Sequence, residues 1–339
     1  MIKLSVIVLI YNMEELLPRC LASLEEQTMK GIQYILVDDG SKDRSGEICD
    51  RWCPTDHTVK VIHKQNEGVT AGWMDGVSAA DGQYVGFVDS DDYIDAEMFE
   101  KLWKNVEDHQ VDISMCNHLY EKNGVKTPNG TVIQAGIYRG EKMDELRYKV
   151  LPKIAERYLS PSLCNKIFRK DLFVANWEFC DKRVTIADDV SVVLPCLFGA
   201  KSMSYIDLPL YHYVTRGNSV SYSYKGNMYL QHELLLDELE RAVRFYKVNL
   251  PAGAYEDVVC AMGNQWLRMI SRAPISHRRK KELLQAFYHD ERYVAASQKA
   301  VPRNKWAKAY KNVILKHHYF KFRIMLWLLD VRDKLKESI

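Results

Sequence analysis

Two kinds of apolar pattern alternate along the first 116 residues of the chain. Short continuous apolar runs predict buried strands, and the segments between them carry apolar residues at helical spacing. The predicted strands are residues 4–10, 33–37, 59–62, 84–88 and 111–116, and the predicted helices are residues 14–26, 43–52, 69–80 and 96–108. This alternation predicts βαβ units, and therefore an α/β fold with a mostly parallel sheet and helices on both faces. Strands buried on both faces are continuously apolar, as these are.

The composition of the 339-residue chain is that of a globular protein, with 47% hydrophobic and 27% charged residues. These proportions exclude a disordered, collagen-like or coiled-coil chain. The length exceeds that of one small domain, so we expect a catalytic or binding domain followed by a second one.

The eight cysteines are scattered, and most lie inside apolar runs. The apolar run near the start is too short for a secretory signal or a membrane span, so we expect free thiols in a reducing cytosol. Cys49 and Cys53 lie one helical turn apart, but no second pair or histidine cluster completes a zinc site.

The rest of the chain changes character twice. Residues 117–140 predict a hairpin, because Asn123-Gly124 and the Pro-Asn-Gly at 128–130 are turn sequences. Residues 141–225 predict helices mixed with short strands. From Met228 onward the spacing is helical, with breaks near prolines 251, 274 and 302.

Polar residues follow four of the predicted strands. The segments are Tyr11-Asn12, Asp38-Asp39-Gly40-Ser41, Gln65-Asn66-Glu67-Gly68 and Asp89-Ser90-Asp91-Asp92. In an open parallel sheet, ligands bind beyond the carboxyl ends of the strands. A purely structural sheet would have ordinary turn residues there, so the pattern favours a ligand site.

The most acidic of these segments indicates a metal. Carboxylates crowded at a strand end repel one another unless a cation or several donors neutralise them. Mg²⁺ typically takes one or two carboxylates together with substrate phosphates, so Asp89 and Asp91 fit a metal that bridges a diphosphate. The alternative is a solvated helix N-terminus with Asp92 or Asp95 as the N-cap, which is compatible with a metal on the other two.

The segment after the second strand allows two interpretations. A carboxylate of Asp38 or Asp39 can accept hydrogen bonds from a nucleobase or from ribose hydroxyls, or the segment can be a helix-capping turn.

Taken together, these segments resemble the family 2 glycosyltransferases, which have the GT-A (Rossmann-like) fold. The resemblance rests on four ordered motifs within the first 100 residues: residues 6–12, residues 37–43, Asn66-Glu67-Gly68-Val69, and residues 82–92. Residues 164–173 resemble the NKLYRRELF-type segment of bacterial members, and Asp188-Asp189 stands where the family usually has Glu-Asp. Residues 209–219 are similar to the strand that closes the domain. The resemblance covers residues 1–225.

The resemblance implies a role for each matching residue. Asp39 would contact the nucleobase, Tyr11 would line its pocket, and Asn66 would also bind the nucleotide. Asp89 would lie by the ribose and share with Asp91 the Mn²⁺ or Mg²⁺ on the diphosphate. Asp189 would be the catalytic base, with His212 as a third metal contact and Arg216 as a diphosphate contact. A structural histidine is the alternative for His212, and a plain helix N-terminus is the alternative for Asp188-Asp189.

The resemblance also implies the activity. We expect an inverting, metal-dependent glycosyltransferase, hexosyl or N-acetylhexosaminyl, that uses a nucleotide-sugar, expected to be a UDP-sugar. The acceptor would be a hydroxyl of a glycan or of a lipid-linked oligosaccharide in cell-surface polysaccharide (capsule-type) synthesis. Residues 1–116 would form the nucleotide-sugar half and residues 117–225 the acceptor half of a GT-A domain, followed by a helical region, 226–339.

One motif departs from the family pattern. Where members often have Ala-Arg-Asn, this chain has Gly72-Trp73-Met74. The missing arginine could contact the nucleotide or brace the acidic loops, so that role is unfilled or filled elsewhere.

Other classes fit less well. A dinucleotide-binding dehydrogenase would need G-x-G-x-x-G after the first strand, and this turn has no glycine. A nucleotidyltransferase would usually show a glycine-rich basic loop there. A nucleotide-sugar-binding protein without transferase activity would have no reason to keep Asp39, Asp89, Asp91 and Asp189 together.

The end of the chain is strongly basic. Residues 303–339 have a net charge of +7. Because the whole chain has a net charge of +2, residues 1–302 have a net charge of −5. Within residues 303–322 there are six Lys/Arg, no acidic residue and several aromatic residues, and an apolar run at 324–329 follows. This pattern predicts a tail that lies on an anionic membrane, which would place the enzyme on the cytoplasmic face of the plasma membrane. The alternative is a helix packed on the protein.

No nucleic-acid motif is present, so we expect no nucleic-acid partner. The sequence leaves homo-oligomerisation open.

Overall fold

The computed structural model describes residues 2–129, 131–151, 153, 158–185, 187–215, 228–300 and 305–337. The chain forms two compact units. The first comprises residues within 1–147, 157–217 and 233–249, and the second comprises residues within 148–156, 218–232 and 250–339. The predicted domain boundary at residue 225 lies outside the described residues, so this division stays a prediction. All the described candidate site residues lie in the first unit.

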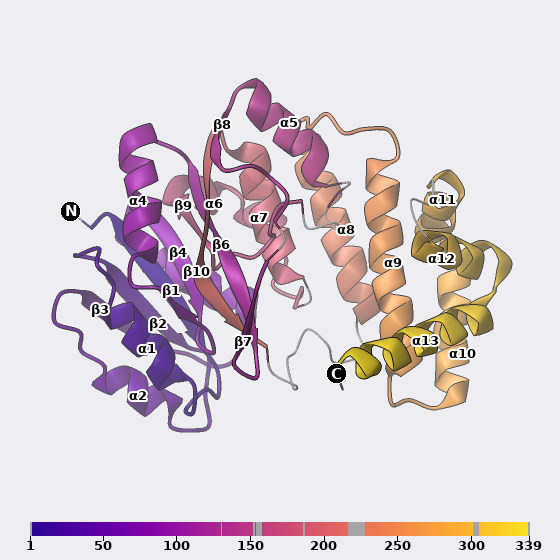
Figure 1. Ribbon diagram of the computed structural model, residues 1–339, viewed down its shortest axis with the longest axis horizontal. Coiled ribbons are helices and arrows are strands. Elements are labelled where there is room, and N and C mark those ends of the chain that lie inside the picture. The colour runs from indigo at the N-terminus through magenta and orange to yellow at the C-terminus, as the bar shows by residue number, and fades with distance from the viewer. Residues whose placement is uncertain are drawn as a thin grey trace. The chain divides into compact units, whose positions relative to one another are not determined.

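A mixed β-sheet forms the centre of the first unit (Figure 1). Its strand order is β3-β2-β1-β4-β9-β6-β10-β5. The strands are β1 (Leu4–Ile10), β2 (Gln33–Asp38), β3 (Thr58–His63), β4 (Tyr84–Asp89), β5 (Tyr93–Ile94), β6 (Ile113–Lys122), β9 (Lys166–Arg169) and β10 (Ser202–Val214). The short strands β7 (Val125–Pro128) and β8 (Gly136–Arg139) pair with β6 and β10.

The first four βα units form the parallel half of the sheet. β1 pairs in parallel with β2 and β4, and β2 pairs in parallel with β3. The helices that follow are α1 (Leu17–Glu25), α2 (Ser45–Arg51), α3 (Val69–Ser78) and α4 (Met98–His109). A β-carbon on Gly72 or Gly76 would lie 2.3 Å or 2.5 Å from a side-chain atom of Leu9 or Ile7, so both glycines allow α3 to pack closely on β1. The predicted fold class is confirmed.

The structure corrects several predicted bounds. α1 begins at Leu17 because Pro18 occupies its first turn, where a missing backbone N–H costs nothing. The strand predicted to end at 116 continues to Lys122 as β6, because it pairs with β10 on one side and with β7 on the other. The predicted Asn123-Gly124 turn is present, with both residues at positive φ.

Two predictions for residues 117–225 were incomplete. The hairpin stops with β7, since β8 pairs with β10 instead of continuing it. The region predicted to hold short strands ends in β10, which has 13 residues and pairs with three other strands. It also contains α5 (Glu141–Val150), α6 (Lys170–Ala175), the 3₁₀ helix η2 (Trp177–Phe179) and α7 (Asp188–Gly199).

From Met228 onward the described residues are mostly helical, as predicted. They are α8 (Met228–Phe245), α9 (Ala254–Arg272), α10 (His277–Tyr288), α11 (Glu291–Lys299), α12 (Lys305–Lys316) and α13 (Tyr319–Glu337). The side chains of Ser276 and Asp290 cap α10 and α11 by accepting backbone N–H groups. In the second unit, the Phe287 ring lies 4.5 Å from the rings of both Trp266 and Tyr293, and these aromatic residues form its core.

The structure supports the packing alternative for part of the basic tail. α12 buries Tyr310, Val313 and Ile314 and contacts α9 and α11, so the packing alternative holds for this helix. α13 buries Phe322 and Leu326. Four apolar side chains of α13 are exposed: Phe320, Ile324, Trp327 and Leu328. Among the described helices, none is both long and apolar enough to cross a bilayer.

Candidate active site

The carboxyl ends of β1, β2 and β4 lie together because the three strands are parallel neighbours. Ile10 pairs with Asp38, and Leu9 pairs with Asp89. The segments after these strands therefore meet at one edge of the sheet, as the sequence predicted.

Asp39 is held by backbone groups from the segment after β3. Its Oδ1 accepts the N–H of Glu67 and its Oδ2 accepts the N–H of Gly68, both at 3.0 Å. The Asp39 residue is only 2% exposed. Each oxygen keeps one lone pair beyond these bonds, so Asp39 joins two loops and retains the capacity to accept a further donor.

Tyr11 and Asn66 are exposed at the same edge, with Tyr11 41% accessible. Asn12 has a positive φ of 54°, and its side chain accepts the N–H of Lys42 at 2.7 Å. Gly40 also has a positive φ, and a β-carbon there would lie 2.9 Å from the backbone nitrogen of Asn66. The loops after β1, β2 and β3 are therefore fitted closely to one another.

Asp38 points to a histidine instead of to the open edge. Its Oδ2 lies 2.9 Å from Nδ1 of His63, whose Nε2 lies 3.0 Å from Asp50 Oδ1. The hydrogen bonds to Asp38 and then to Asp50 raise the pKa of His63. Burial raises the pKa of Asp38, but hydrogen bonds from Ser41 and His63 outweigh burial, and the net shift is downward.

The acidic loop after β4 brings the carboxyl groups of Asp89, Asp91 and Asp92 close together. Burial raises the pKa of Asp89 well above its usual value, and the charges of Asp92 and Asp91 raise it further. Burial and the charge of Asp91 likewise raise the pKa of Asp92 to about 8. A divalent cation would offset this repulsion, so the donor set fits a hard metal ion.

Asp92 attaches this loop to β10 by two hydrogen bonds. Its Oδ2 accepts the hydroxyl of Tyr211 and its Oδ1 accepts the N–H of Val214, both at 2.7 Å. The N-cap alternative was wrong for Asp92 and Asp95, because α4 begins at Met98 with Glu97 before it and has no side-chain cap.

His212 occupies a buried position beside the acidic loop. Its Nε2 lies 2.8 Å from Asp95 Oδ1, and its ring stacks on Tyr93 with centroids 4.2 Å apart. Its Nδ1 has no hydrogen-bond partner among the described residues. Only Nδ1 is therefore available for the predicted metal contact, and a structural role also accounts for the bond to Asp95.

Asp189 lies in the first turn of α7, next to Asp188. The helix N-terminus alternative is thus correct for its position, and it is compatible with catalysis because the helix dipole favours an ionised carboxylate. Asp189 Oδ1 accepts the N–H of Leu163 at 3.1 Å. Burial raises the pKa of Asp189, and the charges of Asp188 and Asp89 raise it further. The structure therefore brings Asp189 into the same electrostatic cluster as Asp89.

Trp73, which stands where family members often have an arginine, lies in the core. Trp73 is 6% exposed, and its ring meets Phe87 edge-on with centroids 6.2 Å apart. A different cation lies near the loops after β2 and β3: Lys64 Nζ is 2.7 Å from Glu67 Oε2 and 4.0 Å from Asp39 Oδ1. The sequence interpretation missed Lys64, although its place directly after the third strand was a usable signal.

The structure bears on the predicted metal site through the arrangement of possible ligands. Within the described parts of the chain, no three His, Cys, Asp or Glu residues are arranged to hold a metal by themselves. A metal shared between one or two carboxylates and a diphosphate does not require such a group. Arg216 lies outside the described residues, so its predicted contact stays a prediction.

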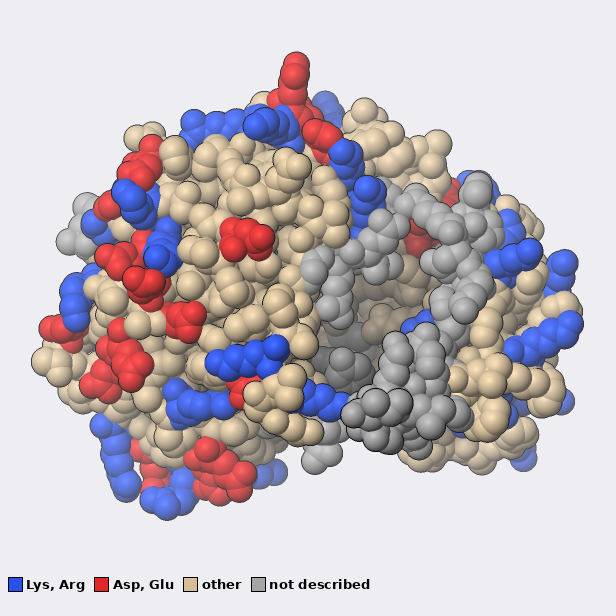
Figure 2. Space-filling view, in the orientation of Figure 1, with Lys and Arg blue, Asp and Glu red and all other residues tan. Residues whose placement is uncertain are grey.

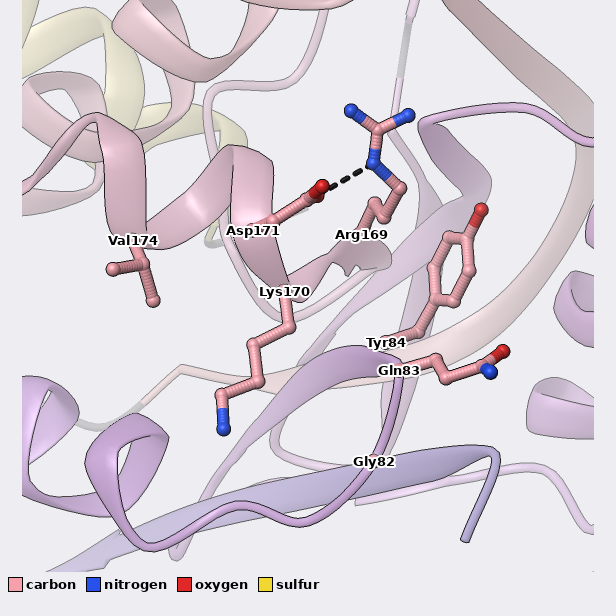
Figure 3. A pocket seen from close by; sticks show the side chains of 7 residues that line it. All are labelled: Gly82, Gln83, Tyr84, Arg169, Lys170, Asp171 and Val174. Atoms are coloured by element: carbon pink, nitrogen blue, oxygen red, sulfur yellow. Dashed lines mark hydrogen bonds and ion pairs between the residues drawn. The ribbon is translucent and has the colours of Figure 1, made fainter. Parts of the chain in front are cut away.

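A pocket of about 590 Å³ lies at the amino end of β4, away from these loops (Figure 3). Arg169 and Asp171 point toward each other in it and form an ion pair, and Lys170 donates to the Ala80 carbonyl. These charges are already paired within the protein, so the pocket is not our candidate site.

Known proteins resemble this chain in sequence and in fold. The family model described as Glycosyl transferase family 2 matches residues 5–172. The uncharacterized glycosyltransferase EpsJ of Bacillus subtilis is 31% identical over 259 residues, which cover 75% of this chain and 72% of EpsJ. The poly(ribitol-phosphate) beta-glucosyltransferase of Bacillus spizizenii is 28% identical over 237 residues, 67% of this chain and 35% of that protein.

A solved structure shows the same fold. The crystal structure of S. aureus TarS residues 1–349 aligns with a TM-score of 0.66 and 19% identity, covering 93% of this chain and 91% of that chain. TarS has also been solved in complex with UDP and with UDP-GlcNAc.

Proposed function

Because the chain belongs to glycosyltransferase family 2, we propose that it transfers a sugar from a UDP-sugar to a glycan hydroxyl with inversion, using Asp189 as the base. The observation that carries this proposal is the cluster in which Asp189 and Asp89 come together from α7 and β4. Family membership favours glycosyl transfer over the alternatives of a nucleotidyltransferase or of a binding protein without activity.

In the proposed reaction, Asp189 accepts the proton of the acceptor hydroxyl as its oxygen attacks the anomeric carbon. The bond from that carbon to the diphosphate breaks at the same time, and the nucleoside diphosphate leaves with the electron pair. The N–H of Leu163 and the first turn of α7 hold the Asp189 carboxylate in place.

The nucleotide would be bound by the loops after β1, β2 and β3. Tyr11 is exposed and can pack on the nucleobase, and Asp39 can still accept a hydrogen bond from a nucleobase N–H. Asn66 is exposed on the adjoining loop, and Arg216 is proposed as a diphosphate contact. The UDP preference is supported by TarS, whose structures hold UDP and UDP-GlcNAc.

The acidic loop supports metal dependence. Asp91 and Asp89 would hold Mn²⁺ or Mg²⁺, with Nδ1 of His212 as a third contact. When bound, the cation neutralises the charge that grows on the departing diphosphate. Tyr211 fixes the loop by bonding both the Asp92 side chain and the Asp89 N–H.

The acceptor class is proposed from the relatives. One relative acts, by its name, on poly(ribitol-phosphate). We propose a cell-surface glycan or a lipid-linked oligosaccharide as acceptor, and transfer of a hexose or an N-acetylhexosamine.

The direct test is a panel of nucleotide-sugars assayed by thermal stabilisation with Mn²⁺ and with EDTA. A UDP-sugar should raise the melting temperature only in the presence of the metal, and its hydrolysis should release UDP. Stabilisation by a nucleoside triphosphate, with pyrophosphate release from it, would instead support the nucleotidyltransferase alternative.

The second unit offers a surface suited to a membrane. Phe320, Ile324, Trp327 and Leu328 lie at helical spacing on one side of α13, and Phe320 and Trp327 are 74% and 63% exposed. Lys308, Lys311 and Lys316 line a pocket of about 440 Å³ on α12. Among the charged side chains that Figure 2 shows on the helical region, Lys and Arg outnumber Asp and Glu.

Apolar side chains beside lysines are the combination that binds the headgroup region of an anionic bilayer, where each cation adds about 1 kcal/mol. We therefore propose that the α13 apolar side and the α12 lysines hold the protein peripherally on the inner face of the plasma membrane, close to lipid-linked acceptors.

A further inference from the structure

The turn that contacts Asp189 is built around a buried lysine. Lys166 begins β9 and is 1% exposed. Its Nζ donates to the carbonyl of Ser160 at 2.8 Å, to the carbonyl of Ser162 at 2.5 Å and to Oδ1 of Asn165 at 2.7 Å. An ammonium group has three N–H donors and a neutral amine only two, so the charged form satisfies all three acceptors.

The bonds of Lys166 determine the direction of the Leu163 N–H. The two carbonyls bound by Lys166 belong to residues on the N-terminal side of Leu163, whose N–H donates to Asp189 Oδ1 at 3.1 Å. On the other side, the Leu163 carbonyl accepts the Lys166 N–H at 3.2 Å. The direction of the Leu163 N–H therefore depends on the Lys166 side chain.

The same turn is anchored to the sheet. Asn165 Nδ2 donates to the carbonyl of Cys116 at 2.6 Å, and the Cys116 N–H donates to the Asn165 carbonyl at 3.0 Å. β9 itself lies between β4 and β6. The lysine thus links the turn that contacts Asp189 to the middle of the sheet.

The charge of Lys166 also reaches the base. Burial raises the pKa of Asp189, and Lys166 is among the groups that oppose this rise. Burial lowers the pKa of Lys166 to about 7, and the charge of Asp189 acts in the opposite direction. A buried cation destabilises a fold unless it is fully paired, and an apolar side chain of similar length would fill the space without that cost.

We propose that Lys166 is a positioning residue, which holds the turn at residues 160–165 so that the Leu163 N–H orients the Asp189 carboxylate toward the acceptor hydroxyl. This inference rests on the proposed function, in which Asp189 is the base.

The test compares Lys166→Met, Lys166→Arg and a matched control, Lys170→Met, in the full-length protein. Lys170 also donates to a backbone carbonyl, that of Ala80, but it lines the pocket at the amino end of β4 (Figure 3). Lys166→Met should lower kcat by about tenfold or more, because a misplaced reacting group is costly. KM for the donor and Kd for UDP should stay within about twofold. Lys166→Arg should restore part of kcat, and Lys170→Met should keep it.

An unchanged kcat in Lys166→Met would overturn the inference. A loss of kcat with an equal loss of UDP binding would also overturn it, since that result indicates a general loss of structure. If Lys166→Met does not fold, Asn165→Ala removes one acceptor of the ammonium and takes its place, and an unchanged kcat there overturns the inference.

Asp189→Asn, measured in parallel, separates this inference from the proposed function. Full activity in Asp189→Asn would show that the proposed base is wrong. A loss in Asp189→Asn with none in Lys166→Met would show that only the role of Lys166 is wrong.

Discussion

Tyr211 and Asp92 are 119 residues apart in the sequence, and the Tyr211 hydroxyl donates a 2.7 Å hydrogen bond to Asp92 Oδ2. The same hydroxyl oxygen accepts the N–H of Asp89 at 3.2 Å. One tyrosine on β10 therefore fixes the loop that carries the proposed metal ligands.

Replacing Tyr211 by Phe should lower the free energy of unfolding by about 1–3 kcal/mol, because a buried carboxylate and a buried N–H lose a partner. Turnover should fall as well, since the acidic loop loses one of its ties to β10 and keeps the bond from the Val214 N–H to Asp92. Urea unfolding and kcat measure the two effects. Tyr205→Phe is the matched control: Tyr205 lies on the same strand, is equally buried, and bonds Asp207. Tyr205→Phe should affect unfolding but not turnover; equal turnover losses would contradict a specific role for Tyr211.

Asp91→Asn should abolish metal-dependent transfer, because a neutral amide cannot replace a carboxylate on a divalent cation. The bond from Arg19 to this residue uses the backbone carbonyl of Asp91, so the substitution preserves it. Sugar transfer is measured with Mn²⁺ and with EDTA. Asp108→Asn, an exposed carboxylate on α4, serves as the control. Unchanged activity in a folded Asp91→Asn protein would rule out the proposed metal role.

Asp189→Asn should lower kcat by about 10²-fold or more, the usual contribution of a general base. The asparagine oxygen can still accept the Leu163 N–H, so UDP binding should remain near normal. Kd for UDP is measured beside kcat, and Asp188→Asn is the neighbouring control, with a smaller expected loss. If UDP binding and turnover collapsed together, Asp189 would be a binding or structural residue.

The stability contributed by His63 should depend on pH. Because hydrogen bonds to Asp38 and Asp50 raise its pKa above 6.5, its contribution is complete below pH 6.5 and is lost as pH rises through the raised value. The pKa of Asp38 is lowered from 3.8, so its contribution is lost only as pH falls below that range. His63→Gln should therefore destabilise the protein more at about pH 5.5 than at about pH 8.5 in urea unfolding. Equal destabilisation at both pH values would mean that the charge of His63 does not stabilise the fold.

The double variant Trp327→Ser, Leu328→Ser should weaken binding to anionic vesicles, because both side chains are exposed on α13 and their loss spares its buried Phe322 and Leu326. Vesicle flotation of full-length protein at low and physiological salt gives the measurement. Leu230→Ser, which removes an exposed leucine from α8, is the control. Equal flotation of wild type and double variant would leave α13 without a membrane role.

The sequence alone determined the parallel half of the fold and the edge of the sheet that holds the candidate site. Continuous apolar runs specify doubly buried strands, and parallel strands bring their carboxyl ends together whatever the helices between them do. Asp89 and Asp91 could therefore be chosen as candidate site residues from local pattern, whereas Asp39 was chosen from the family resemblance. The bounds of α1 and β6 could not, because a proline at a helix start and pairing with a distant strand decide them.

Tertiary structure alone decided which groups hold these carboxylates. Tyr211 reaches Asp92 because β10 pairs with β5 and β6, and Leu163 reaches Asp189 because β9 inserts between β4 and β6. Lys166 stands in the family-like segment at residues 164–173, but neither its burial nor its three acceptors could be read from the sequence. The physical reason is that hydrophobic periodicity is a local property of the chain. The partners of a buried polar group depend on which distant strands lie beside it, and no local pattern records that.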